Sequence, residues 1–182
     1  MILLTGGDPA GGSPEIILQT LDELCPEASA PTLPLLYLCT AGDAHIEAAL
    51  THAQSLGISA RVLTPAEHAA LPGGRIASDA ALLSIADVRA LPVVPADAAD
   101  DDPARWFSFQ ARPGQPDARG GRRAFAARKA ACDFALAARE TAVDVRGILT
   151  APLSKEWVAR GGRPEFRGHT EYLAERFARD VV

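Results

Sequence analysis

The densest group of polar side chains in the sequence lies in TAPLSKEWVARGGRPEFRGHTEYLAERF, residues 150–177. His169 and Thr170 stand just before a stretch with the apolar spacing of an amphipathic helix. Thr170 is predicted to cap that helix, where its hydroxyl, the His169 imidazole and the free backbone N–H groups can all meet one oxyanion. Lys155 supplies a cation that can pair with a carboxylate or a phosphate. These residue types predict a site for an anionic ligand.

A second stretch makes unusual demands on the backbone: LTGGDPAGGSPEIIL, residues 4–18. Ser13 is predicted to be the N-cap of a helix and Pro14 its first residue. The spacing from Gly7 to Gly12 imitates a Walker loop, but Ser13 stands where that loop needs its lysine, and no G-x-G-x-x-G pattern fits. A phosphotransferase that uses this turn is therefore disfavoured. We predict an architectural turn in which Gly11 needs a positive φ or a close backbone approach.

Apolar runs alternate with helical patterns, and this order predicts an α/β fold with a parallel-rich sheet and helices on both faces. Ligands bind at the carboxyl ends of parallel strands, so Thr150, Ser154 and Lys155 follow a strand in the usual position for chemistry. Residues 72–123 carry a weak signal and are predicted to be flexible. The predicted strands are residues 1–5, 33–39, 60–63, 91–95 and 145–152, and the predicted helices are residues 14–24, 43–56, 124–141 and the stretch after Thr170.

The other three histidines are predicted to be surface residues. His45 and His52 are seven positions apart on one predicted helix, about 10 Å along its axis, which is too far for a shared ion. His68 stands alone, so no metal site is predicted within this chain. The three cysteines are odd in number, far apart and without a C-x-x-C motif, which indicates neither a disulfide framework nor a zinc site and fits a reducing cytoplasm.

Composition narrows the classes of partner. Hydrophobic residues make up 48% and aromatic residues 5% of the 182 residues, as in a soluble α/β protein with one core. The net charge of −5 argues against a nucleic-acid partner, which would need a basic face. The first residues contain neither a signal-peptide pattern nor an apolar run long enough to span a membrane, so no membrane partner is expected.

Three motifs carry a family resemblance: GDPAGGSPEI at residues 7–16, TAPLSKE at residues 150–156 and GHTEYLAE at residues 168–175. In order and spacing they resemble the N-terminal half of the 4-hydroxythreonine-4-phosphate dehydrogenase (PdxA) family of pyridoxal phosphate biosynthesis. The resemblance implies an isocitrate- or isopropylmalate-dehydrogenase-like fold and a homodimer. It also implies NAD, a divalent metal (zinc, magnesium or cobalt), and oxidation with decarboxylation of a phosphorylated hydroxy amino acid. His169 and Thr170 would contact the substrate, and Lys155 is a further candidate.

The sequence also departs from that family. Gly12 and Ser13 stand where its glycine motif has Ile and Gly. The family's three metal-binding histidines, and the lysine, asparagine and arginine that hold its substrate, lie in a part that follows the matched region. We therefore expect residues 1–182 to be an N-terminal portion that is inactive alone and contains no metal ligands. Two alternatives stay open: a 4-phospho-D-threonate or 4-phospho-D-erythronate dehydrogenase of the same family, and a non-catalytic remnant that binds anions or dimerises.

Overall fold

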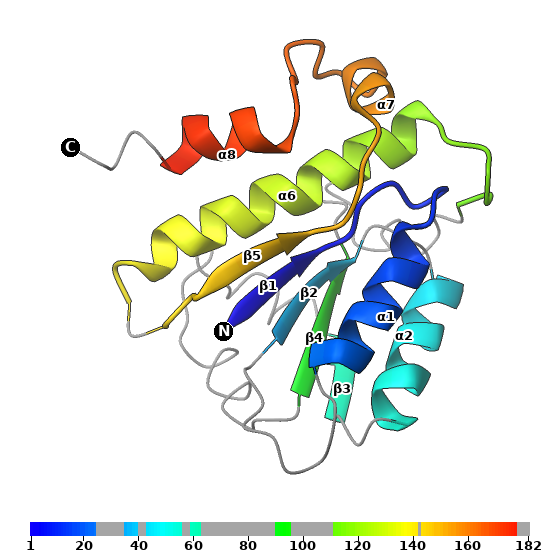
Figure 1. Cartoon of the computed structure of the whole chain (residues 1–182), viewed down its shortest axis with the longest axis vertical. Helices are drawn as coiled ribbons and strands as arrows, with labels where there is room; N and C mark the ends of the chain where they lie inside the picture. Colours follow the sequence, from blue (N-terminus) through cyan, green and yellow to red (C-terminus); the bar gives the residue numbers. More distant parts are fainter. Residues whose placement is uncertain are drawn as a thin grey trace.

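A parallel five-stranded sheet with helices on both faces forms the framework (Figure 1). The structure is a computed structural model that describes residues 1–24, 35–39, 43–55, 59–62, 90–95, 111–141 and 143–177. The strands are β1 (Ile2–Thr5), β2 (Leu35–Cys39), β3 (Ser59–Val62), β4 (Ala90–Pro95) and β5 (Gly147–Thr150), in the spatial order β3-β4-β2-β1-β5. Every pairing between neighbours is parallel, as the alternation of strands and helices predicted.

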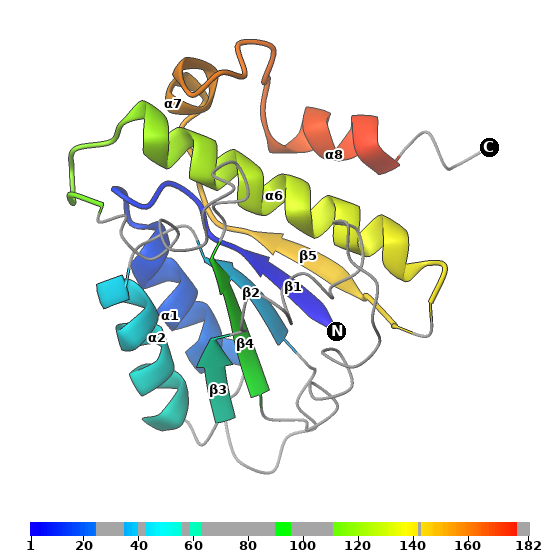
Figure 2. The same cartoon turned by 180° about the vertical axis from the view of Figure 1, so that it is seen from behind.

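Two helices lie on one face of the sheet and a long third helix lies on the other (Figures 1 and 2). The first two are α1 (Ser13–Leu24) and α2 (Asp43–Ser55), and the third is α6 (Ala118–Ala138). Two short helices, α7 (Lys155–Arg160) and α8 (His169–Phe177), pack against α6. None of the helices within the described residues combines the length and apolar character that crossing a bilayer requires.

The core between β1 and α6 is built mostly from small side chains. Leu3 points from β1 toward α6, while Leu4, on the opposite face of the same strand, is buried on the side of α1 and Ile17. The alanine-rich face of α6 lets that helix lie close to the sheet, with Phe134 as its one bulky contribution to the cluster. The core residues are Met1, Leu3, Ala127, Ala131, Phe134, Ala135 and Ala138.

The predicted elements correspond to those of the structure, but several of their bounds differ. β5 covers Gly147–Thr150 rather than residues 145–152, and α6 ends at Ala138 rather than at residue 141. α6 begins at Ala118, well before the expected residue 124, so residues 118–123 of the segment 72–123 are helical. β3 starts one residue earlier than expected, and α7 was not predicted at all. The strand expected at residues 91–95 is confirmed as β4, whereas residues 72–89 and 96–110 of the same segment lie outside the described residues.

The early start of α6 is explained by its cap. The Asp117 carboxylate accepts a hydrogen bond from the backbone N–H of Gly120 at 2.6 Å, which satisfies a helix donor that would otherwise lack a partner. We expect Asp117→Ala to lower the free energy of unfolding by about 1 kcal/mol, measured by urea denaturation. Asp117→Asn retains the acceptor and should unfold like the wild type; equal destabilisation by both substitutions would contradict the capping role.

Candidate functional site

Two neighbouring strands end side by side at the predicted site. β1 ends at Thr5 and β5 at Thr150, and these two residues face each other in the sheet register. The loops that follow are tied together, because the carbonyl oxygen of Pro152 accepts hydrogen bonds from Asp8 N at 2.8 Å and from Ser13 Oγ at 2.7 Å. The glycine turn after β1 therefore fixes the backbone that leads from β5 to Lys155.

The glycine turn is built differently from the prediction. Ser13 is not the N-cap of α1, because its hydroxyl donates to Pro152 and the carbonyl of Gly12 accepts the first helical bond. Gly11 has neither a positive φ nor a close neighbour, since an added Cβ would lie 3.7 Å from the nearest atom. The constrained residue is Gly7, where a Cβ would lie 1.7 Å from the Pro152 oxygen. The turn is thus architectural, but through a different glycine.

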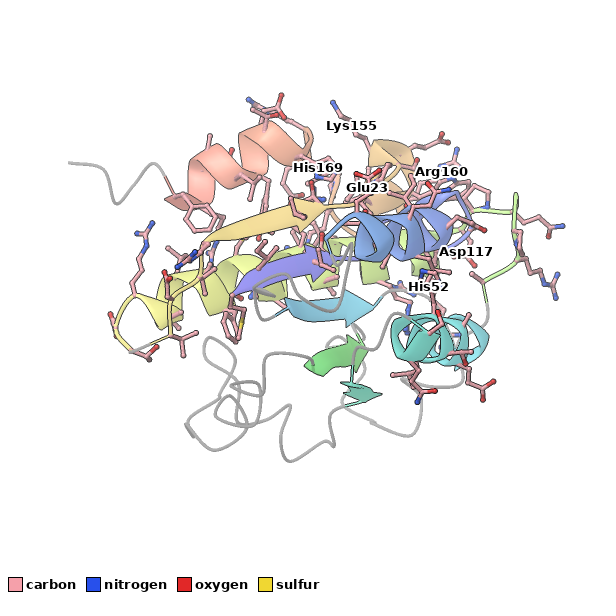
Figure 3. All side chains as sticks on the ribbon, turned by 60° about the horizontal axis from the view of Figure 1, so that its bottom comes forward. Glu23, His52, Asp117, Lys155, Arg160 and His169 are labelled. Atoms are coloured by element: carbon pink, nitrogen blue, oxygen red, sulfur yellow. The ribbon has the colours of Figure 1, made fainter. Side chains whose placement is uncertain are left out.

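Lys155 begins helix α7, which Ser154 caps by accepting from Trp157 N at 3.4 Å. The Lys155 side chain is exposed and reaches over the residue before His169: its Nζ lies 3.2 Å from the point that a Cβ on Gly168 would occupy. Gly168 has a φ of 154°, a conformation that favours glycine. Figure 3 shows Lys155 and His169 on the same side of the molecule, near the end of β5.

Helix α8 starts two residues earlier than the prediction for Thr170 requires. The carbonyl of Gly168 accepts from Tyr172 N at 3.3 Å, so Gly168 takes the capping position and Thr170 lies inside the first turn. The prediction that Thr170 caps this helix is therefore wrong. Thr170 is exposed next to His169, with its hydroxyl not engaged as a cap, and so it is available to a ligand.

His169 is half-buried and lies against a buried arginine that the sequence analysis missed. Its Nε2 is 3.3 Å from Nη2 of Arg128, which projects from the middle of α6. Burial, and then the positive charges of Arg128 and Lys155, lower the pKa of His169 to about 4, so the imidazole is neutral at pH 7. Arg128 could have been found from its position, since it falls on the same helical face as Ala124 and Ala131.

Helix α8 is anchored on α6 by an ion pair and by aromatic contacts. Arg176 pairs with Asp133 of α6. The ring of Phe125 on α6 lies 5.2 Å from that of Tyr172 and 5.7 Å from that of Phe166, both in edge-to-face geometry. Burial is the main cause that raises the pKa of Tyr172 to about 12, which keeps the phenol neutral. These contacts hold the start of α8, and with it His169, in place.

The other histidines are not part of this arrangement. His52 lies on α2, apart from His169 and Lys155 (Figure 3), and it is half-buried rather than a surface residue as predicted. The His45 side chain and His68 lie outside what the structure describes. Over the described residues, no group of three or more His, Cys, Asp or Glu side chains could hold a metal ion.

A further hollow among the described residues is separate from the site. It is a groove of about 530 Å³ between the carboxyl-terminal end of α6, β5 and α8, and it contains none of the predicted site residues. Ile148 and Phe177 contribute apolar surface to it, whereas Arg139 and Asp144 contribute charge.

Comparisons with known proteins agree with the resemblance noted from the motifs. The chain is 34% identical over 175 residues to a 4-hydroxythreonine-4-phosphate dehydrogenase of Burkholderia vietnamiensis, covering 96% of this chain and 40% of that protein. It is 29% identical over 170 residues to a Cutibacterium acnes protein whose provisional name is D-threonate 4-phosphate dehydrogenase, covering 93% of this chain and 40% of the other. The chain thus spans about two fifths of the length of these relatives.

A solved structure and a family model extend the comparison. The crystal structure of a 4-hydroxythreonine-4-phosphate dehydrogenase from Burkholderia phymatum matches with a TM-score of 0.59 at 23% identity, covering 96% of this chain and 42% of that one. This likeness confirms the expected α/β fold. The model of the family described as "Pyridoxal phosphate biosynthetic protein PdxA" matches residues 75–182, more than half of the chain. The chain therefore belongs to the PdxA family.

Proposed function

We propose that the chain is part of an NAD-dependent dehydrogenase that oxidises and decarboxylates 4-phosphohydroxy-L-threonine in pyridoxal phosphate biosynthesis. The observation that carries the proposal is the convergence of Arg128, Lys155 and His169 at one place, with the carboxyl end of β5 leading into it. Two positive charges around a neutral imidazole suit a substrate that carries a phosphate and a carboxylate. The reaction class comes from the names of the relatives.

In this proposal each side chain has a role in binding. Lys155 pairs with an anionic group of the substrate, since its exposed ammonium is free to turn toward solvent. Neutral His169 donates a hydrogen bond to a substrate oxygen, and the Thr170 hydroxyl donates to a neighbouring one. NAD, when bound, would supply the hydride acceptor for oxidation of the substrate hydroxyl. A divalent metal belongs to the same proposal, although the described residues offer no ligand set for it.

A second substrate is favoured by the Cutibacterium acnes relative, whose name refers to D-threonate 4-phosphate. D-threonate 4-phosphate, like the related 4-phospho-D-erythronate, is a phosphorylated hydroxy acid without the amino group. The Lys155 ammonium and the donors of His169 and Thr170 recognise the phosphate and carboxylate that all these compounds share. Among the described site residues, Glu171 is the acidic side chain nearest to Gly168 and is the candidate partner for a substrate amino group.

Two further parts of the proposal rest on the sequence. A homodimer follows from the family resemblance. A cytoplasmic location follows from the cysteine pattern, and Cys132, a free thiol buried in α6, is compatible with it.

Binding measurements on variants of the site test this proposal. We expect isothermal titration calorimetry to detect binding of 4-phosphohydroxy-L-threonine or D-threonate 4-phosphate to the chain. His169→Asn and Lys155→Gln should each weaken that binding by roughly tenfold, because each removes a hydrogen bond or charge pair to an anionic group. Thr170→Val should weaken binding while leaving the free energy of unfolding nearly unchanged, because Thr170 does not cap α8.

Arg160→Gln is the matched control. Arg160 is also exposed and is the last residue of α7, the helix that Lys155 begins, and it forms an i,i+4 ion pair with Glu156. The substitution removes one positive charge without touching the site, and the affinity should stay within about twofold of the wild type. Equal losses for Lys155→Gln and Arg160→Gln would point to a general effect of net charge and against the site. Tight binding of inorganic phosphate alone would favour the non-catalytic anion-binding alternative.

A further inference from the structure

Arg128 is a cation in the middle of α6 whose side chain is completely buried. Its Nε and Nη1 atoms have no hydrogen-bond partner among the residues that the structure describes. Burial lowers the pKa of Arg128 to about 10, so the guanidinium remains protonated at neutral pH. An unbranched apolar side chain of similar length would fill the space without the cost of burying a charge. The arginine therefore has a role other than stabilising the helix.

The contact with His169 indicates what that role is. Nη2 of Arg128 lies 3.3 Å from Nε2 of His169. A guanidinium carries only donors, so Nε2 must accept, and a neutral imidazole that accepts at Nε2 carries its proton on Nδ1. Nδ1 is itself buried and has no hydrogen-bond partner among the described residues. A buried N–H without an acceptor is costly, which points to an acceptor that a ligand supplies.

We propose that Arg128 is a positioning residue that fixes the His169 imidazole in the tautomer protonated at Nδ1 and so presents this N–H to an oxygen atom of an anionic ligand. The identity of the ligand rests on the function proposed above, whereas the tautomer does not depend on it. Arg128 also lies over the Phe166 ring, 5.8 Å from its centroid, which helps to hold the guanidinium in its orientation.

Burial, together with the charges around His169, makes this donor independent of pH over a wide range. Arg128 approaches from α6 and Lys155 from α7, and Glu171 of α8 lies beside Gly168. Burial is the largest cause of the lowered pKa of His169, and the two cations lower it further, to about 4. Protonation is therefore confined to acidic pH, well below the value of about 6.5 at which an ordinary histidine titrates.

Nitrogen-15 NMR of the full chain, labelled in its histidines, tests the proposal directly. His169→Asn identifies the His169 signals among those of the four histidines. We expect the wild-type imidazole at pH 7 to be protonated at Nδ1 and unprotonated at Nε2. Arg128→Met should shift it toward the tautomer protonated at Nε2, which free histidine favours. In Arg128→Met the pKa of His169 should rise above 4 but stay below about 6.5, because the histidine remains buried.

Lys129→Met is the matched control for loss of charge. Lys129 is the next residue on α6 but is exposed and pairs with Asp133, so its substitution should leave the His169 tautomer unchanged. We expect Arg128→Met to weaken binding of the phosphorylated acid by about tenfold at pH 7 while thermal stability is kept or increased. A purely structural arginine would show the opposite pattern: lower stability with no change of tautomer.

A wild-type imidazole protonated at Nε2 would overturn the proposal, and this result does not require that Arg128→Met folds. An unchanged tautomer in a folded Arg128→Met chain would overturn it as well. If the wild-type chain has the expected tautomer, and Arg128→Met changes it, but neither phosphorylated acid binds, the role of Arg128 is supported and the proposed function fails.

Discussion

Gly121→Ala is expected to destabilise the chain by more than about 3 kcal/mol, although it adds a single methyl group to a helix. An added Cβ at this position would lie 2.1 Å from the Trp157 carbonyl oxygen and 2.7 Å from Val158 N. Both atoms belong to the backbone of α7, so no side chain can rotate away. Helix α7 would have to move away from α6, and Lys155 would move with it. Urea denaturation and the NMR spectrum of the chain measure both effects.

The neighbouring glycine is the control. A Cβ on Gly120 would lie 3.2 Å from Cγ of Pro9 and 3.4 Å from the Asp117 carboxylate, contacts that a small shift can relieve. Alanine also favours the helix by up to about 1 kcal/mol over glycine, so Gly120→Ala should stay within about 1 kcal/mol of the wild type. If Gly121→Ala were as stable as Gly120→Ala, the close packing of α6 on α7 would not exist as described.

This pair of glycines also shows where prediction from the sequence fails. Glycine is normally a turn signal, so the run around Gly120 and Gly121 was interpreted as part of a loop, and α6 was predicted to begin at residue 124. In the structure both residues are helical, and Gly121 is required because only glycine lets the backbones of α6 and α7 approach so closely. The strands and the helices α1 and α2 were predicted well, because apolar periodicity depends on burial rather than on individual contacts.

The predicted helix caps and the predicted site residues show the same limit of prediction from the sequence. Ser13 and Thr170 have the side chains of N-caps, yet a carbonyl from a distant loop takes the Ser13 hydroxyl, and Gly168 takes the position expected for Thr170. His169 and Lys155 were found because their polar segment follows a strand, and the structure brings them to the same place. Arg128 was missed, since an arginine on an alanine-rich helix is usually solvated and its burial depends on where α8 packs.

Gly7→Ala is expected to prevent the native fold of the turn at residues 6–12 and to cost at least about 3 kcal/mol. A Cβ at Gly7 would lie 1.7 Å from the carbonyl oxygen of Pro152 and 2.5 Å from Oγ of Ser13. That carbonyl accepts from both Asp8 N and Ser13 Oγ, so moving it away breaks two hydrogen bonds in addition to the steric clash. We expect low yield of folded protein and a lower unfolding midpoint in urea.

Gly11→Ala separates this effect from a general need for glycine in the turn. Gly11 lies four residues further along, has no positive φ and would place its Cβ at ordinary contact distances of 3.7 and 3.8 Å from Asp8. It should therefore unfold within about 1 kcal/mol of the wild type. Equal damage from both substitutions would mean that the whole turn needs glycine flexibility, as the sequence first suggested. Damage at Gly7 alone would mean that one close approach joins the first loop of the sheet to the segment that carries Lys155.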